Sequence, residues 1–439
     1  MSRSPTDRTP AVQTALVIHP VRPHASDARD PNARLTEAVG LAMALDLEVR
    51  ETLVSPLRQV TPATLFGKGR VEELRLLVEA EELDVVVVDD QLTPVQQRNL
   101  EKAWAAKVID RTGLILEIFA RRARTREGKL QVELARLNYE RSRLVRTWTH
   151  LERQRGGFGV MGGPGETQIE TDRRLLADKM GRLKKELVEV RRTRGLHRAA
   201  RKRTPYPTIA LVGYTNAGKS TLFNRLTEAT VLAQDMLFAT LDPTLRTVKL
   251  PDGRPAILSD TVGFISDLPH ELVEAFRATL EEVQEADVVV HVRDIAGPDS
   301  DAQAADVEKV LSELGVTAEK ERALIEAWNK IDLVAEDRRE EVLGEANRAN
   351  ASPVSAITGE GCKVLLERLG GLIDNAVPVG IVLPAGDGKA LAWLYRNGRI
   401  VERVEQDDGG VWVSARLDAQ AIGRFERLHP EALLVDAAR

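Results

Sequence analysis

The segment from Gly213 to Ser220 constrains the fold of this chain more than any other stretch. It reads Gly-Tyr-Thr-Asn-Ala-Gly-Lys-Ser and fits the phosphate-binding pattern G-x-x-x-x-G-K-[ST]. An apolar run, 208–212, precedes it as a buried strand, and residues 221–226 have the apolar spacing of a helix. A glycine loop in this context lets backbone N–H groups and a helix N-terminus face a polyphosphate. The alternative is a glycine-rich turn that matches by chance, and further nucleotide motifs downstream argue against it.

Length and cysteine content bound the rest of the chain. Its 439 residues predict two to four domains, each able to bury its own core. The single cysteine, Cys362, excludes an intrachain disulfide and fits a reducing compartment. No run of 18 apolar residues is present, and polar residues 1–12 lack the apolar region of a signal peptide. We therefore expect a cytoplasmic protein with a disordered tail over residues 1–12 and no membrane partner.

Residues 13–120 are predicted to form an N-terminal α/β domain. Apolar runs at 15–18 and 85–88 predict buried strands. Residues 35–45 and 71–80, which lie between these two strands, and residues 95–104, which follow them, have the apolar spacing of helices. Strands that alternate with helices in this way predict a largely parallel sheet. A small basic glycine loop at 66–70 is most simply a turn, with phosphate contact as the alternative.

Residues 121–203 are predicted to form a basic helical hairpin. Apolar residues recur at steps of three, four or seven between Leu130 and Leu151 and again between Leu176 and Val190. Between the two stretches, six of the ten residues at 156–165 are glycine, so we expect a glycine-rich tip outside both helices. At 1.5 Å per residue, a helix of about 28 residues holds this tip roughly 40 Å from its base.

The hairpin's charge indicates its partner. It carries 24 Lys and Arg against 10 Asp and Glu, an excess of 14 positive charges within a chain whose net charge is −5. A solvated helical pair of mixed charge is the alternative, but such an excess is typical of a surface that binds a phosphate backbone. Aromatic residues are sparse there, which favours structured RNA recognised by shape over stacked single strands, and we expect no DNA partner.

Two further domains complete the predicted architecture. Residues 206–376 are predicted to form the nucleotide domain around the Gly213–Ser220 loop. Residues 380–439 combine a helical pattern at 389–395 with a hairpin pattern formed by 399–405 and 410–417, which predicts a small α+β domain. The fold class we expect is therefore α/β, with a P-loop domain between the helical hairpin and this last domain.

Four motifs follow the P-loop and complete a nucleotide site. A threonine in a loop after the first helix, Thr240, can bind Mg²⁺ through its hydroxyl and the terminal phosphate through its N–H. Asp260, at the end of the strand 256–259, is the expected Walker-B type Mg²⁺ partner, and Gly263 permits close backbone approach to that phosphate. Asp332 can accept both N–H groups on one edge of guanine, which adenine lacks, so GTP rather than ATP is the expected nucleotide.

The expected site residues fall into three groups. Lys219, Thr240 and Gly263 are the expected catalytic residues, and Ser220 and Thr240 the expected Mg²⁺ ligands. The remaining nucleotide-binding residues are Gly213, Tyr214, Thr215, Asn216, Ala217 and Gly218; Phe238, Ala239, Leu241 and Asp242; Asp260, Thr261 and Val262; Asn329, Lys330, Ile331 and Asp332; and Ser355, Ala356 and Ile357, whose N–H groups can meet the guanine 6-oxo group.

In their order and spacing these five motifs resemble a translation-factor-class P-loop GTPase. The glycine-rich block 156–174, the segment 238–244 and the segment 260–265 are similar to those of the HflX family of ribosome-associated GTPases. The resemblance covers nearly the whole chain from about residue 15. It implies GTP hydrolysis with Mg²⁺ on the 50S ribosomal subunit and its 23S rRNA, coupled to ribosome splitting, rescue or biogenesis. It also implies an N-terminal α/β domain, a helical hairpin, a GTPase domain and a small C-terminal domain, and we expect a monomer.

One position predicts slow intrinsic hydrolysis. Where Ras-like enzymes carry a glutamine that orients water, this chain has Phe264, which cannot do so by hydrogen bonding. The missing group must come from a partner or an ion. In related GTPases an asparagine at the position of Asn216 helps to hold K⁺ beside the phosphates; the alternative is that Asn216 only bonds within its loop.

Two other functions remain open at this point. One is a GTP-gated RNA-binding protein whose hydrolysis is incidental, in which a variant without turnover would still complete one round of its task. The other is an ATP-driven RNA-remodelling enzyme that uses the N-terminal domain, in which ATP turnover would survive the loss of Lys219.

Overall fold

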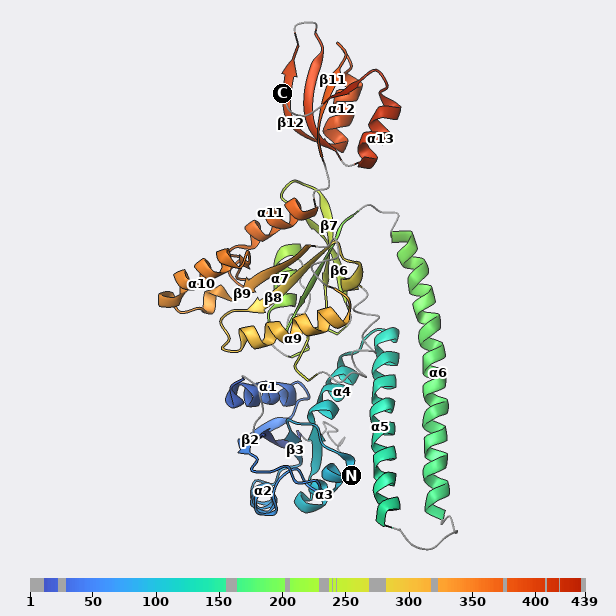
Figure 1. Ribbon diagram of the computed structural model, residues 1–439, viewed down its shortest axis with the longest axis vertical. Helices are drawn as coiled ribbons and strands as arrows, with labels where there is room; N and C mark the ends of the chain where they lie inside the picture. The colour runs from blue at the N-terminus through green and yellow to red at the C-terminus, as the bar shows by residue number, and fades with distance from the viewer. Residues whose placement is uncertain are drawn as a thin grey trace, which may run out of the picture. The chain divides into compact units, whose positions relative to one another are not determined.

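The strands of this chain form three sheets in the part that the structure describes (Figure 1). The computed structural model describes residues 12–22, 29–154, 164–201, 206–228, 237–238, 240–241, 243–267, 282–316, 323–373, 377–406, 409–417 and 419–435. The chain divides into two compact units, residues 1–367 and residues 368–439. The first unit holds two sheets with a helical pair and the second holds one sheet, and the predicted α/β fold class is confirmed.

The N-terminal sheet is fully parallel, with strand order β2-β1-β3-β4. Its strands are β1 (Thr14–Val21), β2 (Glu48–Pro56), β3 (Val85–Val88) and β4 (Lys107–Asp110), and its helices are α1 (Pro31–Met43), α2 (Lys68–Ala80), α3 (Pro94–Trp104) and α4 (Arg111–Arg122). Apolar side chains alternate between the two faces of each strand, so α1 and α4 share one core and α2 and α3 share another. Residues 68–70 of the basic loop belong to the first turn of α2, with Gly67 as its N-cap.

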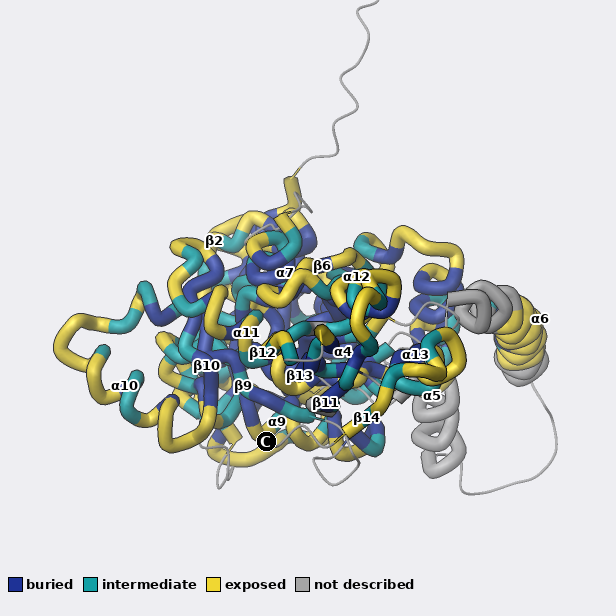
Figure 2. Tube along the Cα trace, turned by 90° about the horizontal axis from the view of Figure 1, so that it is seen from above, coloured by how far each residue is buried: buried dark blue, intermediate teal, exposed yellow. Residues whose placement is uncertain are grey.

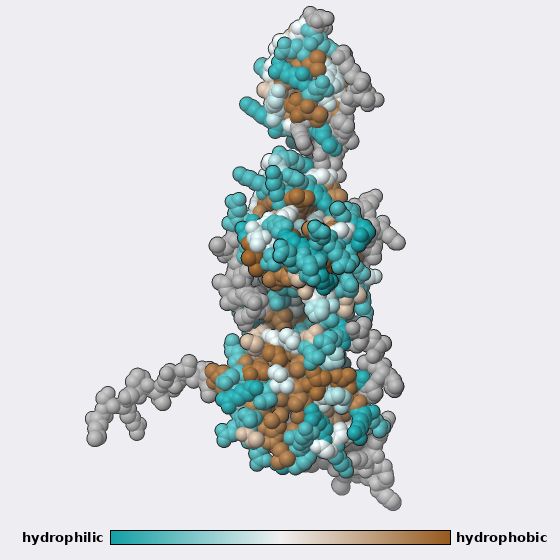
Figure 3. Space-filling view, turned by 90° about the vertical axis from the view of Figure 1, so that its left-hand side faces the viewer, coloured by the Kyte–Doolittle hydropathy of each residue, from teal (hydrophilic) through white to brown (hydrophobic). Residues whose placement is uncertain are grey.

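Part of this sheet could not be read from apolar runs. Strand β2 is an edge strand in which exposed and half-buried residues alternate, and β4 has only four residues. Space-filling colouring shows apolar surface gathered over this domain (Figure 3). Val49 and Leu53 of β2 are half-buried. A strand in the middle of a parallel sheet is buried on both faces and reads as a continuous apolar run. An edge strand such as β2 is covered less completely, so its sequence can include polar residues.

The second sheet of the first unit has the order β10-β9-β8-β5-β7-β6, and only β6 is antiparallel to its neighbour. Its strands are β5 (Thr208–Gly213), β6 (Thr244–Lys249), β7 (Pro255–Asp260), β8 (Val288–Asp294), β9 (Ala323–Asn329) and β10 (Ser352–Pro353), and its helices are α7 (Lys219–Thr227), α9 (Ser300–Glu313), α10 (Glu336–Arg348) and α11 (Cys362–Ile373). The carboxyl ends of its parallel strands meet at one edge, where ligands bind in open α/β sheets.

The basic segment forms two long helices, α5 (Arg126–Gln154) and α6 (Pro164–Arg201), which lie side by side (Figure 1). Their contact is an apolar seam formed by Leu130, Leu137, Met180, Leu183 and Leu187. The expectation that every residue of 156–165 lies outside the helices was wrong for its end, because α6 begins at Pro164 and includes Gly165. Proline suits the first helical turn, since its missing N–H would have no partner there. Residues 156–163 lie outside the described residues.

Helix α5 also packs on the N-terminal domain. It contacts α3 and α4, and its side chains Val132 and Ala135 join the core of that domain. The Tyr139 hydroxyl donates to Asp110 Oδ1 at 2.5 Å, and Arg143 Nη2 donates to Asp110 Oδ2 at 2.6 Å. One helix of the pair is therefore fixed along part of its length by the domain from which it emerges.

The second unit is a four-stranded antiparallel sheet of order β12-β13-β11-β14. Its strands are β11 (Val377–Leu383), β12 (Arg399–Glu405), β13 (Val411–Leu417) and β14 (Leu433–Val435), and its helices are α12 (Gly388–Asn397) and α13 (Ala419–Leu428). Leu394 of α12 and Phe425 of α13 pack on Val413 and Ile381 of the sheet. The helix and the hairpin predicted in this region are present. Across the whole described chain, no helix is both long enough and apolar enough to cross a bilayer.

Candidate nucleotide-binding site

The P-loop follows β5 and leads into α7, which begins at Lys219. Two of its glycines are required by close approach of other parts of the chain. A Cβ on Gly213 would lie 2.2 Å from the Val292 carbonyl oxygen, and a Cβ on Gly218, whose φ is +89°, would lie 2.3 Å from Asn329 Nδ2. No other residue could keep this loop geometry, because both positions combine a positive φ with no room for a side chain.

The Lys219 side chain is buried against the P-loop. Its Nζ donates to the Tyr214 carbonyl oxygen at 2.7 Å. Burial lowers the pKa of Lys219 to about 8, against the opposing effect of Asp260. An ammonium group buried beside the phosphate-facing loop gains most from a polyphosphate, because no solvent screens that attraction.

Three side-chain oxygens converge next to the P-loop in an arrangement that fits Mg²⁺. Ser220 Oγ lies 2.7 Å and Thr240 Oγ1 2.9 Å from Asp260 Oδ2, and the two hydroxyls are 2.8 Å apart. The other Asp260 oxygen, Oδ1, is buried and has no hydrogen-bond partner among the described residues, and burial raises the pKa of this carboxyl. Hard oxygen donors and an orphaned buried carboxylate oxygen are what a hard divalent cation and its bound waters would satisfy.

Gly263 follows this carboxylate and lies directly against the P-loop. A Cβ at this position would be 2.8 Å from Thr215 Cα and 3.0 Å from Lys219 Nζ. The backbone on either side is also tied to the loop, since Thr215 N–H donates to the Phe264 carbonyl at 2.6 Å and Phe264 N–H donates to Gly213 at 3.1 Å. The segment that begins at Gly263 therefore lies where a terminal phosphate on the P-loop would meet it.

Replacing Gly263 by alanine is expected to lower kcat for GTP about 10²-fold or more, with GDP affinity nearly unchanged. The new methyl group would push the segment off Thr215 and so remove a backbone donor from the transition state, a loss typically worth 10²–10³ in rate. Single-turnover hydrolysis and GDP titration measure the two quantities. Gly344→Ala in α10, where no backbone or core atom is within reach, is the matched control. Equal turnover in the two variants would contradict this role for Gly263.

Asn329 joins the P-loop to the loop expected to contact guanine. Its Nδ2 donates to the Ala217 carbonyl at 2.8 Å, and its Oδ1 accepts from the Ala356 N–H at 3.0 Å. The neighbouring Lys330 has a φ of +67° and pairs through Nζ with Asp294 at 2.7 Å. Asp332 lies in the short 3₁₀ turn that follows, Ile331–Leu333, and its carboxylate is half-buried. Asn329 thus links the P-loop to the 355–357 loop, and Asp332 lies in the turn beside that link.

The loop at 355–357 differs in part from expectation. Ser355 N–H donates to the Glu360 carbonyl at 2.9 Å, and Ala356 N–H is directed to Asn329. Of the three N–H groups expected to meet the guanine 6-oxo group, only that of Ile357 has no acceptor within the described part of the chain. The loop is held from outside the motifs by Arg225 of α7, which donates to the carbonyls of Ala356, at 3.1 Å, and of Ile357.

Several expected binding residues direct their side chains into the core, so only their backbone can meet a nucleotide. These residues are Tyr214, Phe238, Leu241, Val262 and Ile331. Thr261 is also buried, and its hydroxyl donates to the Leu211 carbonyl at 2.6 Å. The Phe238 ring packs edge-to-face on Phe119 of α4 with centroids 4.6 Å apart, while its N–H donates to Thr215 Oγ1 at 3.1 Å. Ala239 and Asp242 lie outside the described residues.

The structure also shows the positions of Phe264 and Asn216, the two residues expected to affect the rate of hydrolysis. Phe264 is 3 % exposed and packs in the core, so its ring lines no water-binding position. Asn216 is exposed on the P-loop with a φ of +59°, a conformation that asparagine tolerates.

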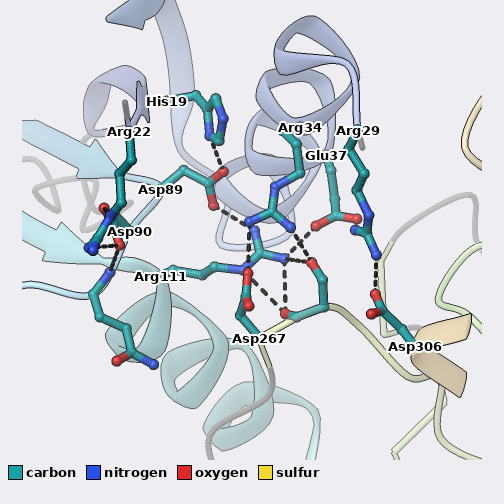
Figure 4. A network of polar contacts seen from close by, with 12 residues as sticks. His19, Arg22, Arg29, Arg34, Glu37, Asp89, Asp90, Arg111, Asp267 and Asp306 are labelled. Carbon is teal, nitrogen blue, oxygen red and sulfur yellow. Dashed lines mark hydrogen bonds and ion pairs between the residues drawn. The ribbon is translucent and has the colours of Figure 1, made fainter. Parts of the chain in front are cut away.

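The sequence motifs did not identify a group of N-terminal residues beside this site. Arg34 and Glu37 of α1 and Arg111 of α4 form a polar network with Ser266 and Asp267, which follow Gly263 (Figure 4). Arginines on amphipathic helices are usually solvated, and no motif marks these. Only their burial in the folded chain shows that they belong to the site.

Comparison with known families covers almost the whole chain. Residues 32–120 match the family described as GTP-binding GTPase N-terminal, and residues 122–201 match the GTP-binding GTPase middle region. Residues 208–330 match the family described as 50S ribosome-binding GTPase, and residues 342–430 match the HflX C-terminal domain.

Individual relatives are similar over nearly their full lengths. A GTPase HflX of Magnetococcus marinus is 52 % identical over 400 residues, which are 91 % of this chain and 91 % of that protein. GTPase HflX of Escherichia coli is 42 % identical over 415 residues, 94 % of this chain and 95 % of that protein. A third GTPase HflX, from Caldanaerobacter subterraneus, is 41 % identical over 415 residues, 94 % of this chain and 92 % of that protein.

Proposed function

Since this chain belongs to the HflX family of GTPases, we propose that it binds the 50S ribosomal subunit through its basic helical hairpin and uses GTP to split, rescue or help assemble ribosomes. We propose further that it acts in the cytoplasm as a monomer and that hydrolysis depends on Mg²⁺. The observation that carries the proposal is the exposed positive charge of α6 in a chain that also holds a GTPase site.

The nucleotide site supports the following division of roles. Backbone N–H groups of the P-loop and Lys219 bind the phosphates, and Asp332 selects guanine. Ser220, Thr240 and Asp260 would hold Mg²⁺, which neutralises charge on the β- and γ-phosphates when bound. The Gly263 N–H donates to the terminal phosphate. No side chain of the Gly263–Asp267 segment aligns water by the glutamine route, because Phe264 is turned into the core.

The surface of α6 supports an RNA partner. The middle of this helix is exposed on the side away from α5 (Figure 2). Among the side chains of α6 that the structure describes, the exposed basic residues are Arg173, Arg174, Lys179, Arg182, Lys184, Lys185 and Arg192. Within the described part of the chain, two of these residues form ion pairs, Lys179 with Glu133 at 2.8 Å and Arg192 with Glu189 at 3.2 Å. Most of this charge therefore remains available to phosphates.

Co-sedimentation with separated ribosomal subunits tests the proposal. The full chain is expected to pellet with large subunits, more tightly with a nonhydrolysable GTP analogue than with GDP, and not with small subunits. Binding that ignores the nucleotide, or that favours the small subunit, would contradict it. A variant that binds GTP but does not turn over should then be mixed with intact ribosomes. If this variant splits ribosomes for one round as fast as the native chain does, GTP binding alone drives splitting, and hydrolysis only returns the protein to its starting state.

K⁺ is expected to raise kcat several-fold over Na⁺ at equal ionic strength. An exposed amide oxygen on the P-loop is a hard neutral ligand for a monovalent cation, and such a cation beside the phosphates offsets charge that develops in the transition state. Turnover in KCl and in NaCl measures the effect. Asn216→Ala should lose the K⁺ stimulation with little loss of GTP affinity. Equal rates of the native chain in both salts would leave the ribosome as the source of the missing catalytic group.

A further inference from the structure

The segment after Gly263 is held by the N-terminal domain rather than by the GTPase sheet alone. Arg34 Nη1 donates to Ser266 Oγ at 2.6 Å, and its Nη2 donates to Asp267 Oδ2 at 2.7 Å. Arg111 donates to the same Ser266 through Nη2, to Oγ at 2.8 Å and to the backbone carbonyl at 3.2 Å (Figure 4). Asp267 has a φ of +56°, in the left-handed region that aspartate tolerates as asparagine does.

Tyr214 connects this network to the P-loop. Its hydroxyl accepts from the Ser266 N–H at 2.9 Å and donates to Glu37 Oε2 at 2.6 Å, while its carbonyl accepts from Lys219. Glu37 in turn pairs with Arg111. One side chain of the phosphate-binding loop therefore touches both the segment after Gly263 and the N-terminal domain.

Arg111 is itself fixed by a buried carboxylate. Arg111 is 2 % exposed, and its Nη1 donates to Asp89 Oδ1 at 2.5 Å. On the far side, Asp89 Oδ2 lies 2.8 Å from His19 Nδ1. Burial alone would raise the pKa of Asp89, but Arg111, His19 and Arg34 together hold it well below its usual value. The hydrogen bonds that Arg34 and Arg111 donate to the Ser266 hydroxyl are charge-assisted, because a guanidinium keeps its charge when buried.

The other nucleotide-contacting segment meets the N-terminal domain through apolar contacts. Phe238, two residues before Thr240, packs on Phe119, and Leu237 lies close to Gly40 of α1, where an added Cβ would be 3.0 Å from Leu237 Cδ1. Both segments that flank the expected γ-phosphate position are thus supported by α1 and α4.

From these contacts we infer that Arg34 and Arg111, acting through Ser266 and Tyr214, are positioning residues for GTP hydrolysis: they hold the Gly263 N–H where the terminal phosphate needs it. The N-terminal domain is then a working part of the GTPase centre. The inference rests on the assignment of the nucleotide site and is independent of the ribosomal partner. Holding the segment in advance removes the entropic cost of ordering it at each turnover.

Removal of single polar atoms tests this role in the full chain without ribosomes. Tyr214→Phe deletes the oxygen that accepts the Ser266 N–H, and Ser266→Ala deletes the hydroxyl that both arginines contact. Each is expected to lower kcat about tenfold while KM for GTP and affinity for GDP stay within twofold. Affinity for GDP with aluminium fluoride, a mimic of the transferring phosphoryl group, should fall along with kcat. Ser266→Thr, which keeps a hydroxyl, should restore most of the rate.

Asp306→Asn is the matched control. It breaks the ion pair between Arg29 and Asp306 of α9, which joins the same two domains. It leaves in place Arg29 and its hydrogen bond to the Tyr214 hydroxyl at 3.4 Å, and among the described residues Asp306 makes no hydrogen bond to the Gly263 segment. It should leave kcat unchanged. An equal loss in Asp306→Asn would show that domain contact in general matters and would overturn the positioning role. Unchanged or faster turnover in both Tyr214→Phe and Ser266→Ala would overturn it too, since the network would then be structural or restraining.

Discussion

Replacing Asp332 by asparagine is expected to lower GTP affinity roughly 10²-fold or more and to move base preference toward xanthine. The Asp332 carboxylate can accept both N–H groups on one edge of guanine, whereas an amide offers a donor that suits the 2-oxo group of xanthine. The side chain is half-buried and lies in a short turn. Titration with the triphosphates of guanosine, xanthosine and adenosine measures the change.

The control for this titration is the same substitution at a nearby exposed aspartate. Asp337→Asn removes one exposed carboxylate from the first turn of α10, five residues along the chain, and should leave all three affinities as they are. If Asp332→Asn binds GTP as tightly as the native chain does, the guanine site has been placed wrongly. Hydrolysis of xanthosine triphosphate by the variant would show in addition that the phosphate end of the site is intact.

Reversing three charges on α6 is expected to weaken binding to the large ribosomal subunit about 100-fold or more in moderate salt. Arg174, Arg182 and Lys185, each changed to glutamate, are exposed residues outside the apolar seam with α5. The logarithm of native affinity should fall steeply with the logarithm of salt concentration, and the variant's slope should be smaller by about three. GTP affinity should not change, because the substitutions lie far along the chain from every nucleotide motif.

A second triple variant separates local from net charge. Lys309, Arg348 and Lys363 are exposed basic residues of α9, α10 and α11, and their change to glutamate alters net charge equally. This variant should bind the subunit nearly as the native chain does. Similar losses in the two variants, or a native affinity that ignores salt, would indicate that α6 is only a solvated helix.

Much of this protein follows from local sequence because its chemistry uses contiguous motifs. The P-loop glycines, Lys219 and Ser220 stand together, and three of the other four motifs follow a short apolar run. Parallel strands bring their carboxyl ends to one edge, so residues after such runs must gather there. The apolar seam of the hairpin was also readable, because its 3.5-residue spacing repeats over many turns.

Other features could not be predicted from the sequence, because they depend on which parts of the chain pack against one another. Edge strand β2 and four-residue β4 carry too little periodicity to be recognised, and the start of α6 at Pro164 depends on turn geometry. The peptide N–H groups of Ser355 and Ala356 were expected to face guanine. Their acceptors, Glu360 and Asn329, are chosen by the folded loop.

The sequence by itself determined that this chain is a P-loop GTPase with a basic hairpin, since glycine, lysine, carboxylate and charge patterns each have a local physical meaning. Only the tertiary structure decided that Tyr214 faces the N-terminal domain and that Arg34 and Arg111 reach Ser266 from 232 and 155 residues away. The reason is physical. An arginine on an amphipathic helix can face water or be buried with a partner, and the helix sequence is compatible with both. Only the packing of α1 and α4 against the GTPase core removes Arg34 and Arg111 from water and gives their charges fixed partners.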